Sequence, residues 1–214
     1  MFGHILSFAK DVERRNPQGL IEVVRLLLRP LQSELLASAV MNGIHEARGE
    51  IGSAGFFMPG GPSDMQYCGK DPRLEPENFR VHLNRDPVLP CPWHRGRYVD
   101  ALSLIGSGKS RGRWEEDPTN HVIVLWLPWG IPFVTGGNHS IASGILGGEG
   151  ILRPTEVYDM SRLLAEVHCD GKFFRSTSDN RVLDEVRDGR IAALFEIGRM
   201  IRSNGLIPMQ ESGD

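Results

Sequence analysis

Cysteine is scarce in this 214-residue sequence, which contains only three. They are far apart, and no two have the Cys-x-x-Cys spacing: Cys68, Cys91 and Cys169. An odd number of distant cysteines argues against a disulfide framework and against a zinc knuckle. We therefore expect reduced thiols and a cytoplasmic protein.

Charge of one sign and long apolar runs are also lacking. The formal net charge is −3, so contact with nucleic acid would need a local basic patch. No apolar run is long enough to span a bilayer, and residues 1–10 lack the features of a signal peptide. The sequence has no Walker A motif and no signature of a DNA-recognition helix. These absences exclude a P-loop nucleotide site and disfavour a sequence-specific DNA-binding regulator.

What is present is the composition of an ordinary globular protein, with 40% apolar and 24% charged residues. We predict an α/β (α+β) fold, a small mixed sheet with surrounding helices and a helical segment before it. Residues 1–78 form this helical segment and a Gly/Pro-rich connection, and residues 79–214 form the sheet domain with a C-terminal helix.

The first part of the chain is densely apolar. Asn16-Pro17 is typical of a helix start, and Pro30 predicts a break or kink farther along. The apolar positions fit a helix packed on both sides: Leu20, Ile21, Val23, Val24, Leu26, Leu27, Leu28, Leu31, Leu35, Leu36 and Val40. A partner-binding or membrane-lying helix has the same pattern, but burial against the sheet is favoured. Residues 49–78 predict an irregular connection, either a linker or a lid over the central site.

The second part alternates between strand and helix patterns. Phe79–Leu83 predicts a strand, and Leu163–His168 with Lys172–Phe174 predicts a hairpin around a Cys-Asp-Gly turn. Arg181–Arg202 has nearly helical apolar spacing and predicts a closing amphipathic helix, with a break at Gly189.

Residues 120–146 form the central stretch of the sequence. His121–Leu127 and Ile131–Thr135 predict two strands, and Ile141–Leu146 has helical spacing. Between strand and helix lies a glycine turn that we call the Gly-Gly turn: Gly136, Gly137, Asn138, His139 and Ser140. Bare main chain at a helix start leaves amide N–H groups for an anion, above all phosphate.

Basic residues gather upstream of this turn. A proline-stiffened run leads to Arg95 and Arg97, and Tyr98–Ile105 predicts an amphipathic helix. The densest basic cluster of the sequence follows it: Lys109, Arg111 and Arg113. This cluster is either a grip on the phosphate backbone of DNA or a solubilising loop.

This order of elements over residues 87–146 resembles the ParB/sulfiredoxin superfamily, whose members have a Pro…Arg run, a short helix, two strands and a phosphate-binding turn. In this resemblance Gly136 and Gly137 match the glycines of the turn, and His139 matches the motif histidine. Arg95 or Arg97 matches the arginine after the prolines. Asn138 stands where sulfiredoxin has its reactive cysteine, so sulfinic-acid reduction is not expected. Ser140 stands where a basic residue is usual.

Within that superfamily the chain is most similar to the fertility-inhibition (oncogenic-suppression) branch of conjugative plasmids. That resemblance implies nucleotide hydrolysis (ATPase) and DNA cleavage (DNase) that restrain conjugative and T-DNA transfer. The implied cofactors are ATP and Mg²⁺ or a similar divalent cation. The implied partners are DNA and a coupling protein or transferred substrate of the conjugative secretion system.

A triphosphate needs amide donors, guanidinium groups and, usually, Mg²⁺ held by carboxylates. We expect the Gly-Gly turn to supply the amides. Arg95 and Arg97 would clamp the phosphates, or alternatively pair with acids on the surface. His139 would donate a hydrogen bond or act as an acid or base. His121 begins the neighbouring strand and would join His139. Four acids are candidates to hold metal or orient water, with a solvated loop or turn as the simpler interpretation: Glu115, Glu116, Asp117 and Glu149. No carboxylate spacing identifies the metal ligands.

The leading functional hypothesis is thus a nucleotide-binding hydrolase with DNase activity that restrains DNA transfer. The alternative is a non-catalytic inhibitor that binds a protein of the DNA-transfer machinery. In that case the Gly-Gly turn would only shape a helix start.

Overall fold

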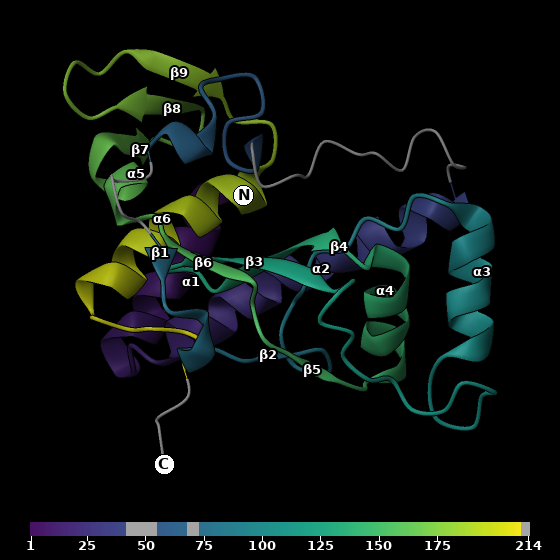
Figure 1. Ribbon diagram of the computed structural model, residues 1–214. Coiled ribbons are helices and arrows are strands. Elements are labelled where there is room, and N and C mark those ends of the chain that lie inside the picture. Colours follow the sequence, from purple (N-terminus) through teal and green to yellow (C-terminus); the bar gives the residue numbers. More distant parts are fainter. Residues whose placement is uncertain (42–54, 68–72, 211–214) are drawn as a thin grey trace.

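The computed structural model describes residues 1–41, 55–67 and 73–210, and it confirms the mixed α/β (α+β) class (Figure 1). The described helices are α1 (Phe2–Arg15), α2 (Gly19–Met41), α3 (Arg95–Leu104), α4 (Asn138–Gly147), α5 (Ser161–Glu166) and α6 (Gly189–Ser203), with short 3₁₀ turns η2 (Asp64–Tyr67) and η3 (Pro76–Asn78). The described strands are β1 (Arg73–Leu74), β2 (Val81–His82), β3 (Val122–Leu127), β4 (Ile131–Gly136), β5 (Ile151–Leu152), β6 (Glu156–Asp159), β7 (Val167–Cys169), β8 (Phe173–Ser176) and β9 (Val182–Glu185).

The central sheet is mixed, as the sequence predicts, with strand order β1-β6-β3-β4. Strands β3 and β4 form an antiparallel hairpin in which Trp126 lies opposite Ile131, whereas β3 and β6 run parallel. Strands β2 and β5 form a separate ribbon, and β7-β8-β9 form a third small sheet. In Figure 1, α3 and α4 lie side by side at one end of the molecule, and β7-β8-β9 lie at the other end.

Strand β3 is buried on both faces, which explains its nearly continuous apolar sequence. Trp126 belongs to the main hydrophobic core, formed with α1, α2, α5 and α6. Ile123 points into a second core with Trp114 and Ile141, which supports α4. The hairpin thus connects the main core to the end of the molecule where α3 and α4 lie.

The N-terminal helices are integrated with the C-terminal one. Helices α1 and α2 pack against α6, and their buried side chains share the main core with it. Arg190 on α6 binds Glu34 on α2, with Nη1 2.7 Å from Oε1. The division at residue 78 into two parts stays a prediction.

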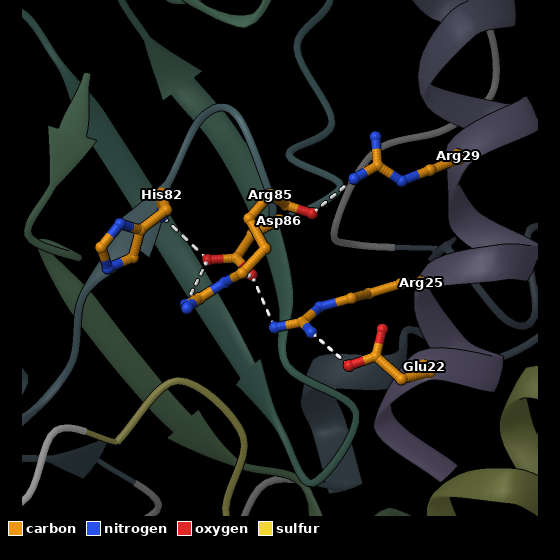
Figure 2. A network of polar contacts seen from close by, with 6 residues as sticks. All are labelled: Glu22, Arg25, Arg29, His82, Arg85 and Asp86. Carbon is orange, nitrogen blue, oxygen red and sulfur yellow. Dashed lines mark hydrogen bonds and ion pairs between the residues drawn. The ribbon is translucent and has the colours of Figure 1, made fainter. Parts of the chain in front are cut away.

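A buried carboxylate fixes α2 to the turn after β2 (Figure 2). Asp86 is 1% exposed and accepts hydrogen bonds from Arg25 Nη2 at 2.9 Å, from Arg85 Nε at 3.0 Å and from the His82 amide at 2.8 Å. Nη1 of Arg25 donates to Glu22, and Arg29 donates to the carbonyl of Arg85. Figure 2 shows Arg25 and Arg29 reaching from α2 to this turn.

Of the two alternatives predicted at Pro30, the break is wrong, because α2 continues through it to Met41, and the kink stays a prediction. Pro30 is exposed, and the carbonyl that it leaves without its helical partner belongs to Leu26, which is itself exposed. Leu31, Leu35 and Leu36 are buried beyond the proline and hold the helix together. The predicted start is displaced as well, since Asn16 ends α1 and its side chain accepts from the amide of Gln18, just before α2.

Two elements of the C-terminal half differ from prediction. Residues 163–166 are helical in α5, because Leu163 and Leu164 both face the main core. Residues 182–185 form β9 against β8, and α6 begins only at Gly189, capped by Asp188.

An earlier strand is also shorter than predicted. The strand expected at 79–83 is reduced to Val81–His82, and Phe79 forms an isolated bridge to Gln210.

Two parts of the predicted irregular connection, residues 49–54 and 68–72 with Cys68, lie outside the described residues. Of the parts that are described, residues 55–67 pack Phe56, Phe57 and Met58 into the main core, and residues 73–78 contain β1 and η3. In the described chain, no helix is both long enough and apolar enough to cross a membrane.

Candidate functional site

The Gly-Gly turn joins β4 to α4 by a close backbone approach. Gly137 has a φ of 73°, and a Cβ added to it would lie 2.4 Å from Cδ2 of His121. A Cβ added to Gly136 would lie 2.8 Å from the carbonyl oxygen of Asn120. Only glycine fits both positions, so the two glycines fix where α4 begins.

The first amides of α4 have no acceptor. The amide of Ile141 donates to the Gly137 carbonyl at 2.9 Å and is the first in the helical series. Among the described residues, nothing accepts a hydrogen bond from the amides of Asn138, His139 and Ser140. These residues are half-buried rather than covered. The turn therefore offers three consecutive N–H donors at the positive end of a helix.

Two side chains connect the turn to the proline-rich run. Asn138 Oδ1 accepts from the amide of Cys91 at 2.7 Å, and His139 Nε2 accepts from the amide of His94 at 3.0 Å. An accepting Nε2 places the proton of the neutral ring on Nδ1. Burial lowers the pKa of His139, and nearby Arg97 and His94 lower it further. His139 is thus a neutral ring whose Nδ1–H is a donor.

Helix α3 begins beside this contact. His94 Nδ1 accepts from the amide of Arg97 at 3.2 Å and caps the helix. The guanidinium of Arg97 lies over the indole of Trp93, 5.6 Å from the ring centroid. The hydrogen bond to His94 and the stacking on Trp93 both fix Arg97, so its positive charge is held at the start of α3.

These elements enclose an open cleft of about 380 Å³. Its walls come from the start of α4, one face of α3 and two loops: Trp93, Arg97, Asp100, Ala101, Ile105, Arg111, Asn120, Thr135 and the five residues of the Gly-Gly turn. Within the described chain, neither Arg97 nor Arg111 forms an ion pair with a carboxylate. The cleft therefore combines amide donors with guanidinium groups that are not neutralised.

Glu149 shapes the loop that brings Arg111 to the cleft. Its two oxygens accept from the amides of Ser107 at 3.0 Å and Trp114 at 2.9 Å. Hydrogen bonds from the Ser107 hydroxyl and from these amides lower the pKa of Glu149 to about 2, so it is ionised. Glu149 therefore positions the loop, and it is not among the residues that line the cleft.

Trp114 anchors the end of this loop. Its Nε1 donates to the carbonyl of Ser140 at 2.8 Å, and its ring stacks on His121 at 4.9 Å. His121 is buried, its Nδ1 accepts from the amide of Asp117, and burial lowers its pKa. It supports the turn from behind and does not line the cleft.

The structure brings only part of the predicted set together. The Gly-Gly turn, Arg97 and Arg111 share the cleft. The other candidates are exposed and are not among the residues that line it: Arg95, Lys109, Arg113, Glu115 and Asp117.

Two of the three carboxylates before β3, those of Glu116 and Asp117, accept hydrogen bonds from protein groups. Asp117 accepts from the amide and hydroxyl of Thr119, and Glu116 accepts from the amide of Arg153. No group of three or more His, Cys, Asp or Glu residues suited to a metal ion occurs in the described ranges. Asp117 thus stabilises its own turn, and Glu116 connects this segment to Arg153.

Sequence reasoning missed six residues of the cleft: Trp93, Asp100, Ala101, Ile105, Asn120 and Thr135. One signal for Asp100 was present, because it follows Arg97 by three residues, a spacing that places two residues on one face of a helix that contains both. Thr135 belongs to β4 and Asn120 precedes β3, and the antiparallel pairing of the two strands brings both residues to the cleft.

Comparison with known proteins places the chain in a family. No curated protein and no solved structure matches it. Residues 1–207, nearly the whole chain, match the family described as a family of unknown function, DUF6710, and the chain therefore belongs to this family.

Proposed function

We propose that the cleft binds the phosphate groups of a nucleotide, and that the protein is a nucleotide-binding hydrolase of the ParB/sulfiredoxin type. The observation that carries this proposal is the set of acceptor-free amides of Asn138, His139 and Ser140 in one cleft with Arg97 and Arg111. The order α3, β3, β4, Gly-Gly turn, α4 supports the superfamily assignment.

Each donor has a distinct role in this proposal. The amides bind one phosphate at the helix start, where the helix dipole adds to their attraction. Arg97 and Arg111 approach from two other elements and neutralise the remaining charge, since guanidinium groups bind phosphate through paired N–H donors.

His139 acts as a donor in this arrangement. Its Nε2 is engaged by the His94 amide, and Nδ1 carries the proton, so the ring stabilises negative charge on a phosphate oxygen. Catalysis then consists chiefly of positioning and charge stabilisation, as is usual for phosphoryl transfer.

Titration calorimetry with ATP, CTP, GTP and inorganic tripolyphosphate tests the proposal. We expect Arg97→Ala and Arg111→Ala each to weaken binding by about tenfold, because each removes a charged hydrogen-bond donor. Arg95→Ala is the matched control, since Arg95 is an exposed arginine on α3 that does not line the cleft. Absence of binding by the wild-type protein, or an equal loss in all three variants, would overturn the proposal.

We propose DNA as a second ligand, because Lys109 and Arg113 flank Arg111 on the loop held by Glu149. The combined change of Lys109, Arg111 and Arg113 to Ala should weaken DNA binding and flatten its salt dependence. Arg153→Ala, in an exposed arginine of another loop, is the control. If both variants bind DNA equally tightly, the loop of Lys109, Arg111 and Arg113 is not a DNA-binding site.

A role in restraining conjugative transfer rests on the resemblance. In a mating assay, donor cells that make the wild-type protein should transfer a conjugative plasmid less often, and Arg97→Ala should relieve this restraint. Full restraint by a folded Arg97→Ala variant that no longer hydrolyses nucleotide would favour the non-catalytic inhibitor.

A further inference from the structure

Asp100 is the one acidic residue among the described residues that line the cleft. It lies on α3 one turn after Arg97 and is exposed to solvent. Its carboxylate has no hydrogen bond or ion pair within residues 1–41, 55–67 and 73–210. This differs from Glu116, Asp117 and Glu149 of the neighbouring loops, each of which accepts a hydrogen bond from a protein amide.

A bare carboxylate in a phosphate cleft is unfavourable by itself. Asp100 and a bound phosphate carry charge of the same sign, and like charges that share a site repel each other. A cation between them converts this repulsion into two attractions. The cleft offers that cation an oxygen ligand from the protein, while the phosphate supplies the others.

We propose that Asp100 binds a divalent cation such as Mg²⁺, which enters the cleft together with the phosphate groups of the ligand. This inference rests on the proposed function, because the phosphate completes the coordination. Mg²⁺ prefers oxygen ligands, keeps several waters and is commonly bound through one or two carboxylates plus substrate phosphates. One unengaged carboxylate is therefore sufficient, and a preformed cluster of acids is not required.

The placement on α3 gives the cation a defined position. Residues three apart on a helix are neighbours, so Asp100 and Arg97 present a carboxylate and a guanidinium to the same cleft. Arg97 binds phosphate oxygens directly, and Asp100 binds them through the cation. Together they would fix the orientation of a polyphosphate chain that begins at the amides of α4.

Titration calorimetry with and without Mg²⁺ tests this inference, using ATP and inorganic tripolyphosphate as separate ligands. For the wild-type protein we expect Mg²⁺ to tighten binding of both ligands by about tenfold, the size of one charged contact. Asp100→Asn should abolish this enhancement for both ligands. Without Mg²⁺ it should bind them as tightly as the wild type, or more tightly, because the repulsive charge is gone.

Asp117→Asn is the matched control, because it removes a carboxylate of the same size whose oxygen is engaged in its own turn. This variant should keep the full effect of Mg²⁺. A direct readout is the relaxation of water protons by Mn²⁺ in the presence of tripolyphosphate, which should change with wild type and Asp117→Asn but not with Asp100→Asn.

Three results would overturn the inference. If Asp100→Asn weakens ATP equally with and without Mg²⁺ and leaves tripolyphosphate unaffected, Asp100 accepts from the ribose hydroxyls instead. If Mg²⁺ tightens binding in Asp100→Asn as in wild type, the cation is held elsewhere, while phosphate binding in the cleft stands. If the wild-type protein binds neither ligand, the proposed function fails together with the inference.

Discussion

At the scale of single residues, Asp64 is the most unusual group outside the cleft. It is fully buried, and Oδ2 accepts from the amide of Phe57 at 2.9 Å. Its Oδ1 has no hydrogen-bond partner among the residues that the structure describes. Burial raises the pKa of Asp64 to about 7, and the nearby charge of Asp184 contributes in the same direction.

Because this pKa lies above that of the unfolded chain, the protonated carboxyl stabilises the fold at low pH. The stabilisation is fully present below about pH 4 and is lost as the pH rises through 7, by roughly 4 kcal/mol in total for a shift of this size. Asp64→Asn keeps the shape without the charge and should remove this pH dependence. Urea unfolding of both proteins between pH 4 and pH 8 measures the difference, and parallel curves would contradict it.

Single residues were predicted correctly where only one structural requirement explains the residue type. Gly136 and Gly137 were identified because a bare turn before a helix requires them, and the close approach to His121 agrees. Sequence did not reveal the tautomer of His139, because the partner that sets it is the His94 amide, 45 positions away. Asp100 was not predicted for a similar reason, since the role proposed for it depends on which other acids are already engaged.

At the scale of elements, the Asp86 network tests how α2 is held (Figure 2). Arg25→Leu removes one of two guanidinium partners from a buried carboxylate, so the remaining charge is poorly compensated. We expect a loss of about 3 kcal/mol in the free energy of unfolding. Arg29→Leu, also on α2, removes one hydrogen bond to a carbonyl and should cost about 1 kcal/mol or less. Equal losses in urea unfolding would argue against a special role for Asp86.

The loop held by Glu149 allows a second element-scale prediction. Glu149→Gln replaces one accepting oxygen by an NH₂ group that opposes an amide donor, which releases either Ser107 or Trp114. Trypsin should then cut after Lys109, Arg111 or Arg113 several-fold faster than in the wild type. Glu116→Gln is the control, because Glu116 accepts from Arg153 outside this loop. Unchanged cleavage would show that Trp114 alone holds the loop.

Elements were predictable where local sequence and tertiary packing agree. The hairpin β3–β4 and the following helix were placed within a few residues, because β-branched runs, glycine and helical spacing coincide there. The segments that became α5 and β9 were misassigned, since Leu163 faces the core as part of a helix and Val182 pairs with Arg175 of β8. Partners distant in sequence decided both cases.

At the scale of the whole molecule, the two ends of the chain share one core. Residues from α1 and α2 are buried with residues of α6, and Arg190 joins Glu34 across this contact. A chain that begins at Phe79 would expose the apolar side of α6 and one face of the sheet. We expect it to lack a cooperative thermal transition by near-UV circular dichroism.

Adding residues 1–78 as a separate polypeptide should restore the transition, because the missing surface is then supplied in trans. A sharp transition in the shortened chain alone would instead establish an independent domain after residue 78. Sequence predicted the mixed class and the order β3, β4, α4. It did not predict that α1 and α2 pack against α6, because the apolar pattern of a helix does not specify which surface the helix covers.

Tryptophan is distributed so that the molecule contains its own optical reporter. Trp93 is 39% exposed and lines the cleft, whereas Trp114, Trp126 and Trp129 are at most 6% exposed. Aqueous quenchers such as iodide or acrylamide should therefore extinguish the fluorescence of Trp93 selectively, and the other three indoles should emit at shorter wavelength. Binding of a ligand in the cleft can then be measured in the unlabelled protein, because the ligand should protect the red-shifted emission of Trp93 from the quencher.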